Sequence, residues 1–355
     1  MPRDTRLTLW PEQIGFLPLT SSWAEIKNTT VLDFSHCATN VRSCGLAATA
    51  LNLSWIFKAN MNLTQASNKK QNEQLKLIYP EDSLHNEKQS KLKNNIRYIE
   101  KIIPNKKEHI ISSCAMLGFF LCIEKYINEE LRSLYCADKE KNEIIHSGIE
   151  YKKTSFPIFY FDISKYKHNP REILDVFLNY SIPIFDKIFS HDIEKGNQIN
   201  HILVEIVKNI ADHADADGFV GIDCDEYDDR KMVSILIGDC GPGIYQHMRD
   251  HYIKKRFERG KYTGLAEVYR FALLDEVSTS SNRDNYGCGM STIINNCLDL
   301  DVQISVFDEA SRLVLSSLSR IKKQGPSHNE LWRSSHRFDG KKPFFYFLQC
   351  EEKTR

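Results

Sequence analysis

The sequence lacks several patterns that would place a protein in a large class at once. Its ten cysteines form no C-x-x-C pair, and no Cys/His cluster has zinc-site spacing. No stretch approaches the roughly 18 apolar residues of a membrane-spanning helix, and the N-terminus has no apolar signal core. Basic and acidic residues balance at 47 each, so no excess charge favours nucleic acid or an anionic membrane. We therefore expect a soluble, cytoplasmic protein with reduced cysteines.

With 355 residues, of which 41% are hydrophobic, the chain is long enough for roughly two domains. We expect a smaller N-terminal α/β domain over 1–150 and a larger α/β domain over 196–355. A strand and a helix within 151–195 would connect them. Residues 58–109 are rich in Lys, Asn, Gln and Glu and bury too little apolar surface to order strongly. We expect a mobile insertion there, with either a solvated helical face or a basic contact surface.

Hydrophobic periodicity predicts the secondary structure. Pro183 is expected to kink or divide its helix, and 245–286 is expected to form an active-site lid or a surface excursion. Strands are predicted over 30–37, 156–163, 219–224, 232–237, 302–307, 312–318 and 343–349. Helices are predicted over 47–57, 110–134, 170–189, 264–276 and 289–300, with another around 202–210.

The first of three polar clusters lies on the helix predicted around 202–210. Its members Glu205, Asn209 and Asp212 are spaced i, i+4 and i+7, which places them on one helical face. Carboxylate and amide oxygens along one stripe suit a hard cation such as Mg²⁺. A spare carboxylate beside the cation can deprotonate an attacking water. Alone, the pattern is more typical of an ordinary amphipathic helix with a charged outer face.

The second cluster, Asp239-Cys-Gly241-Pro-Gly243-Ile244, follows a predicted strand. A carboxylate at a strand end can accept a hydrogen bond from an exocyclic amine such as that of adenine. The neighbouring glycines let the backbone approach a flat base closely. Alone, a Gly-Pro-Gly segment is as often a plain turn.

The third cluster, Gly287-Cys-Gly289-Met290, comes just before a predicted helix. Glycines at a helix N-terminus expose backbone N–H groups that favour phosphate. Ser278 and Thr279 lie upstream and add hydroxyl groups. Alone, a G-x-G segment is usually a cap or a turn, and the upstream residues read equally well as a polar loop.

Together, the order and spacing of the three clusters resemble the GHKL ATPase superfamily. This group includes histidine kinases, gyrase-type topoisomerases, mismatch-repair clamps, heat-shock chaperones and anti-sigma-factor serine kinases. The resemblance covers roughly residues 196–350, and the Glu-x-x-x-Asn-x-x-x-His spacing is nearest to the anti-sigma-factor serine kinases. It implies a Bergerat-type ATP-binding fold, which is a two-layer α/β sandwich with a mixed, mostly antiparallel sheet and helices on one face.

The resemblance also implies a role for each cluster. Asn209 would bind Mg²⁺, Glu205 would activate a water or a hydroxyl, and Asp239 would bind the adenine amine. Two departures stand out: 338–345 lacks the family's Gly-Thr pair, and Asn285-Tyr286 replaces an arginine-glycine lead. The remaining nucleotide contacts would come from Asp212, Gly241, Gly243, Ile244, Ser278, Thr279, Gly287, Gly289 and Met290.

Residues 28–57 resemble a STAS domain, the usual antagonist partner of those kinases. The resemblance rests on VLDFSHC at 31–37 and RSCGL at 42–46, followed by an apolar helix. In that family a serine before the Gly-Leu pair can be phosphorylated, and Ser43 holds that position. Since Arg42 replaces the family's preceding aspartate, we do not expect phosphorylation, and a plain strand-loop-helix gives the same pattern.

The sequence therefore predicts an ATP- and Mg²⁺-binding module that hydrolyses ATP or phosphorylates a protein, acting as a regulatory or signalling switch. The expected partners are ATP and a protein partner or protein substrate, with a homodimer left open. Neither a membrane nor nucleic acid is expected. The main alternative is a non-catalytic, nucleotide-gated interaction module, and a weaker one is an adaptor with a decayed site.

Overall fold

The computed structural model describes residues 5–8, 30–33, 42–67, 76–78, 113–126, 155–166, 170–214, 216–248, 289–308, 311–315, 332–337 and 344–353. The strands are β1 (Thr5–Thr8), β2 (Thr30–Asp33), β3 (Lys76–Ile78), β4 (Phe159–Phe161), β5 (Gly218–Glu226), β6 (Arg230–Asp239), β7 (Gln303–Asp308), β8 (Ser311–Leu315), β9 (Trp332–Arg337) and β10 (Phe344–Lys353). The helices are α1 (Ser43–Ser67), α4 (Phe119–Cys122), α7 (Ile163–Tyr166), α8 (Pro170–Ile188), α9 (Ile193–His213), α10 (Gly243–Met248) and α13 (Gly289–Asp299), with the 3-10 helix η3 (Glu124–Tyr126).

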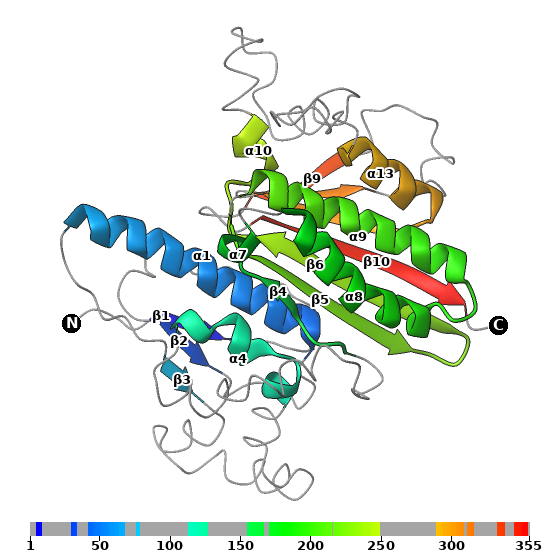
Figure 1. Cartoon of the computed structure of the whole chain (residues 1–355), viewed down its shortest axis with the longest axis horizontal. Coiled ribbons are helices and arrows are strands. Elements are labelled where there is room, and N and C mark those ends of the chain that lie inside the picture. Colours follow the sequence, from blue (N-terminus) through cyan, green and yellow to red (C-terminus); the bar gives the residue numbers. More distant parts are fainter. Residues whose placement is uncertain are drawn as a thin grey trace, which may run out of the picture.

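The main sheet has seven strands in the order β4-β5-β6-β10-β7-β8-β9 (Figure 1). Each neighbouring pair in it is antiparallel. β6 and β10 form its long central pair, which runs from Asp239 opposite Phe344 to Arg230 opposite Lys353. A separate parallel sheet contains β1, β2 and β3. The predicted α/β class, with an antiparallel sheet and packed helices, is therefore confirmed.

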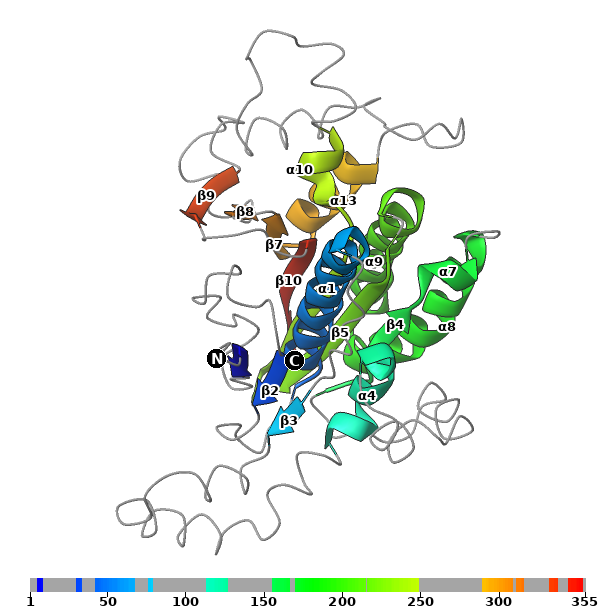
Figure 2. The same ribbon diagram turned by 90° about the vertical axis from the view of Figure 1, so that its left-hand side faces the viewer.

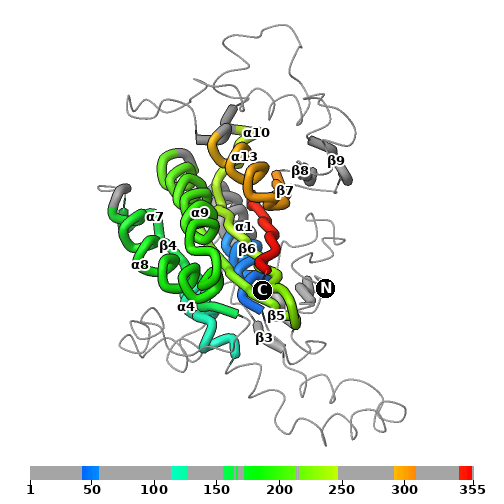
Figure 3. Tube along the Cα trace, turned by 90° about the vertical axis from the view of Figure 1, so that its right-hand side faces the viewer, coloured from blue at the N-terminus to red at the C-terminus, as the bar shows by residue number. Residues whose placement is uncertain are grey.

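One face of the main sheet packs against α8, α9 and α13, which lie next to one another (Figure 3). Apolar residues of α9 recur at helical spacing, and Ile202, Leu203 and Ile206 are fully buried. They meet alternate residues of the central strands, as the period of a β-strand requires. These strand residues are Val220, Ile222, Val233, Ile235, Ile237, Tyr346 and Leu348.

The opposite face of the sheet packs against α1, which runs alongside β5 and β6 (Figure 2). Phe219, Leu236 and Phe345 belong to this second core, together with Leu46 to Leu53 of α1. α1 approaches β5 closely at Gly221, where a Cβ would lie 2.7 Å from the carbonyl oxygen of Ser43. The expected sandwich had helices on one face alone, and α1 adds a layer on the other.

Several predicted elements have different bounds in the structure. The helix expected over 110–134 is interrupted at Gly118, whose φ of +74° favours glycine. α8 runs through Pro183 as one helix, so Pro183 does not divide it. α1 continues to Ser67, inside the segment expected to be a mobile insertion. β9 was not expected, because its sequence WRSSHR has little apolar character.

Both β4 and α8 come from the segment expected to connect two domains, yet they belong to the main sheet and to its first core. The helix expected over 264–276, the lid beyond Met248, and most of the insertion 58–109 lie outside the described residues. Within the part of the chain that is described, no helix combines the length and the apolar character needed to cross a bilayer.

Candidate functional site

The candidate site is built around Asp239, the last residue of β6. Its side chain is 3% exposed, and its Oδ1 accepts a hydrogen bond from the backbone N–H of Gly241 at 2.7 Å. Asp239 lies between Gly218 of β5 and Phe344 of β10 in the sheet register. The apolar strand thus ends in a buried carboxylate whose position is set by the neighbouring strands and by the loop that follows.

Two glycines after Asp239 fit positions that larger residues would not. A Cβ on Gly241 would lie 2.8 Å from the carbonyl oxygen of Ala214, which follows α9 directly. Gly243 has φ +74°, and a Cβ there would lie 2.5 Å from Oδ1 of Asp308. Close packing and backbone conformation therefore both require glycine in this loop.

Asp308 is a member of the site that the sequence analysis missed. It ends β7, is 1% exposed, and its Oδ2 accepts a hydrogen bond from the backbone N–H of Tyr245 at 2.8 Å. This bond holds the first turn of α10, so Asp308 positions the loop from Gly241 to Gly243. The signal was available: like Asp239, Asp308 is an acidic residue directly after an apolar strand.

The first cluster lies on α9, as predicted. Glu205 and Asn209 are half-buried, and Asp212 is exposed near the end of the helix. The contact between Gly241 and Ala214 brings the end of α9 against the loop after β6. The structure therefore places the first and second clusters at the same end of the sheet. Ile244, also predicted to bind nucleotide, packs partly buried against the first core.

The third cluster is described only in part. Gly289 and Met290 begin α13, which packs against α9, the helix of the first cluster, and against β7, the strand that ends in Asp308. Helix formation from Gly289 agrees with the prediction. Ser278, Thr279 and Gly287 lie outside the described residues.

Metal-ligating side chains do not gather in the described part of the chain: no group of three or more His, Cys, Asp or Glu residues is placed to hold an ion. Mg²⁺ carried by a nucleotide needs few protein ligands, since phosphate and water supply the rest. Asn209 lies on one helical face with Glu205, and its predicted Mg²⁺ contact stays a prediction.

Ser43, the position compared with a STAS phosphorylation site, is fully buried. Its Oγ accepts a hydrogen bond from the backbone N–H of Ile222, and its own N–H donates to Asp223 at 3.0 Å. The hydroxyl is therefore part of the contact between α1 and β5 and is closed to a kinase.

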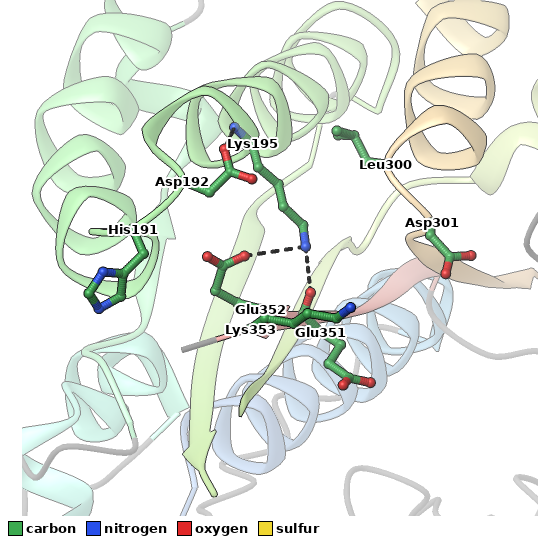
Figure 4. Close-up of a pocket in the computed structure, with 8 residues that line it drawn as sticks. All are labelled: His191, Asp192, Lys195, Leu300, Asp301, Glu351, Glu352 and Lys353. Atoms are coloured by element: carbon green, nitrogen blue, oxygen red, sulfur yellow. Dashed lines mark hydrogen bonds and ion pairs between the residues drawn. The ribbon is translucent and has the colours of Figure 1, made fainter. Parts of the chain in front are cut away.

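A cavity of about 500 Å³ lies at the opposite end of the sheet (Figure 4). Lys195 of α9 pairs there with Glu352, with Nζ 3.3 Å from Oε2, and also bonds the carbonyl oxygen of Glu351. On β10 the lining residues begin at Glu351, seven positions or roughly 23 Å from Phe344, so the cavity is distinct from the candidate site. Its lining residues are His191, Asp192, Lys195, Leu300, Asp301, Glu351, Glu352 and Lys353.

No protein-family model matches the chain, and no curated protein matches it at a significant level.

Proposed function

We propose that this protein is an ATP- and Mg²⁺-binding module of the GHKL type that hydrolyses ATP or transfers its phosphoryl group to a protein. The buried carboxylate of Asp239 carries this proposal. It ends a central strand, and the following loop abuts the helix that carries Glu205 and Asn209. The carboxylate proposed to bind adenine and the carboxylate proposed to accept a proton thus belong to neighbouring elements.

The residues around Asp239 suit a flat, amino-substituted base. An ionised carboxylate only accepts hydrogen bonds, so it pairs with an exocyclic amine and repels a carbonyl oxygen. Gly241 has no side chain, and its packing against Ala214 leaves the loop close to the end of α9. Gly243 begins α10 and lets the chain turn without crowding Asp308. These features support base binding at the end of β6.

The polar residues on one face of α9, Glu205, Asn209 and Asp212, would carry out hydrolysis or phosphoryl transfer. The amide oxygen of Asn209 would hold Mg²⁺, and Asp212 would add a polar contact to the nucleotide one turn further along. Bound Mg²⁺ would supply neutralisation of charge on the phosphate oxygens. Glu205 would accept the proton of the attacking water or protein hydroxyl. The N-terminal segment would bind the protein partner.

Replacing the proposed catalytic base, Glu205, and the acid proposed to bind adenine, Asp239, in turn tests this function. Glu205→Gln keeps the shape of the side chain and removes its ability to accept a proton. We expect it to retain ATP binding and to lose phosphate release or phosphotransfer by at least about 100-fold. Asp239→Asn should weaken ATP binding instead. Turnover that survives in Glu205→Gln would show that Glu205 is not the base.

A second function is a nucleotide-gated interaction module without catalysis. The absence of the Gly-Thr pair from residues 338–345 favours it, because one of the family's nucleotide contacts is then missing. Phosphate release by the purified full chain, with and without Mg²⁺, separates the two functions. ATP binding without release would favour the non-catalytic module, whereas the lack of an ATP-dependent melting shift would contradict both.

A further inference from the structure

Asp217 lies on the segment that leaves α9 and enters β5, directly before Gly218. Its side chain is 19% exposed, and both of its carboxylate oxygens accept hydrogen bonds. Oδ2 accepts from the Lys125 ammonium and from the Tyr160 hydroxyl, each at 3.1 Å. Oδ1 accepts from the backbone N–H of Ile163 at 3.3 Å. One carboxylate therefore joins η3, β4 and α7 to the chain that follows α9.

The main chain at Asp217 is bonded to the candidate site. Its carbonyl oxygen accepts a hydrogen bond from the backbone N–H of Cys240 at 3.2 Å, and the next residue pairs with Asp239 in the sheet register. A little earlier, the carbonyl oxygen of Ala214 lies 2.8 Å from the place that a Cβ on Gly241 would take. The segment between α9 and β5 thus contacts the end of β6 and the start of the loop that follows it.

The two side chains that donate to Asp217 are themselves held in place. Nζ of Lys125 also pairs with Asp162 at 2.9 Å, and the ring of Tyr160 packs on that of Phe219 with centroids 5.1 Å apart. Burial alone would lower the pKa of Lys125, but the hydrogen bond with Asp162 and the charge of Asp217 raise it. Burial and the charge of Asp217 raise the pKa of Tyr160. Both groups therefore stay protonated at neutral pH and donate to Asp217.

Neutralising Asp217 would loosen this arrangement. The amide of Asp217→Asn keeps one acceptor oxygen and replaces the other with an N–H donor, so the bonds to one of the two oxygens are lost. Since the same residue holds Cys240 through its carbonyl oxygen, the loss is passed to the residue beside Asp239. Small displacements of a binding group are enough to weaken a site, because its groups must be held close to one geometry.

We propose that Asp217 is a positioning residue for the proposed nucleotide site, which holds Asp239 and Cys240 in place, and that Lys125 links it to η3. This inference rests on the proposed nucleotide-binding function and deepens it, because it names a contact through which η3 can regulate nucleotide affinity. The side chain of Lys125 is 49% exposed, so a protein partner at η3 has access to it.

The test compares Asp217→Asn with Asp162→Asn in the full chain. Each change neutralises one acid beside Lys125, but it is Asp217 that is bonded to Cys240. Affinities for ATP and ADP with Mg²⁺ would be measured by isothermal titration. Amide hydrogen exchange of residues 239–244 would be measured by mass spectrometry without nucleotide.

We expect Asp217→Asn to weaken the binding of ATP and of ADP by the same factor, about 3- to 10-fold, as for the loss of one or two buried hydrogen bonds. The factor is shared because the loop after β6 is proposed to bind the base, which both nucleotides carry. Exchange in residues 239–244 should become faster, since the N–H of Cys240 is held less firmly. Asp162→Asn should leave both affinities and this exchange at the wild-type values.

The outcomes separate this inference from the proposed function. Unchanged exchange and affinity in a folded Asp217→Asn, with ATP binding intact in the wild type, would overturn the positioning role. Equal effects of Asp217→Asn and Asp162→Asn would also overturn it, because they would reflect a general loss of stability. A wild-type chain that binds no nucleotide would refute the proposed function, and the exchange measurement would still show whether Asp217 holds the loop.

Tyr160→Phe is a milder variant for the case in which Asp217→Asn does not fold. It removes one donor to Asp217 and keeps the ring that packs on Phe219. We expect it to weaken the binding of both nucleotides by about 2- to 3-fold, as for one neutral hydrogen bond. Wild-type affinity and exchange in Tyr160→Phe would then overturn the positioning role.

Discussion

Asp223 lies in the middle of β5, at the contact with α1. Among the acidic residues at this contact, we expect its replacement to lower the free energy of unfolding most. The residue is 2% exposed, and its carboxylate accepts three hydrogen bonds across the two elements and the adjoining chain. The backbone N–H groups of Ser43 and Cys44 donate at 3.0 and 2.9 Å, and the Ser155 hydroxyl donates at 2.6 Å. The Nε of Arg42 lies 3.5 Å away. A strand residue thus caps the first turn of a helix that is distant in sequence.

The expected loss of stability follows from the groups that Asp223→Ala leaves without an acceptor. Two N–H groups at the N-terminus of α1 and one hydroxyl would lose a buried, charged acceptor, and Arg42 would lose one of its two acids. Removing one partner of a buried ion pair typically costs about 3–5 kcal/mol. Each unsatisfied buried donor costs about 1–3 kcal/mol, but rearrangement would relieve part of this loss. We expect the free energy of unfolding to fall by about 3–5 kcal/mol.

Asp225→Ala is the matched control. Asp225 lies two residues along the same strand and binds the same arginine, with Nη1 and Nη2 of Arg42 at 2.6 and 3.0 Å. Its side chain is 28% exposed, so water can replace much of what is lost. Pairs of this kind contribute about 1 kcal/mol or less. The difference between the two variants therefore isolates the cap on α1 from the ion pair with Arg42.

Urea unfolding followed by circular dichroism measures both losses, with the free energy taken from the midpoint and the slope. Asp223→Asn would fall between the wild type and Asp223→Ala, because the amide keeps one acceptor oxygen. Equal losses in Asp223→Ala and Asp225→Ala would refute the capping role. In that case α1 would be held on the sheet by its other contacts, apolar packing above all.

Two further predictions concern the loop after β6 and the buried thiols. Gly243→Ala should lower the melting temperature by the equivalent of about 1–2 kcal/mol or more, because φ is +74° and the new methyl group meets Asp308. Gly45 lies in α1, and a Cβ there would meet no atom within 4 Å, so Gly45→Ala should raise the melting temperature. A lower melting temperature in both variants would contradict this reasoning. Burial raises the pKa of Cys297 and Cys350 to about 12, from an ordinary value of 9.0. In the unfolded chain these thiols lose their protons at a lower pH than in the folded chain. The urea midpoint of the wild type should therefore fall as the pH rises above about 9, and it should fall less in a variant with both Cys297 and Cys350 replaced by alanine.

The sequence predicted best where hydrophobic periodicity was strong and local. α9, β5 and β6 follow from runs in which apolar residues recur at 3.6 or 2 residues. The bounds of β5 and β6 differ from the prediction by one or two residues at each end, whereas α9 begins nine residues before the predicted stretch. Such elements need no knowledge of distant partners, because the pattern itself records which face is buried.

What the sequence did not predict depends on contacts between distant residues. Asp308 reads as an ordinary acid after a strand until its contact with Gly243 and its bond to Tyr245 are known. Tyr346 reads as one aromatic residue among several until the register places it opposite Ile237 and Val306, two residues from the acids that end β6 and β7. α1 reads as part of a separate N-terminal domain, because no local signal names the surface that it covers. Its run from Leu46 to Leu53 is apolar on most sides, which indicated burial without indicating a partner.

The position of α1 has a direct consequence for the candidate site. Leu51 of α1 packs against the end of β6, since a Cβ on Gly238 would lie 2.9 Å from its Cδ2. The thiol of Cys240 donates to the carbonyl oxygen of Leu51 at 3.5 Å. Both residues next to Asp239 in sequence therefore touch α1. A movement of α1 on the sheet would shift the residues on either side of Asp239, the acid proposed to bind the base, so α1 is placed to couple a bound partner to the proposed nucleotide site.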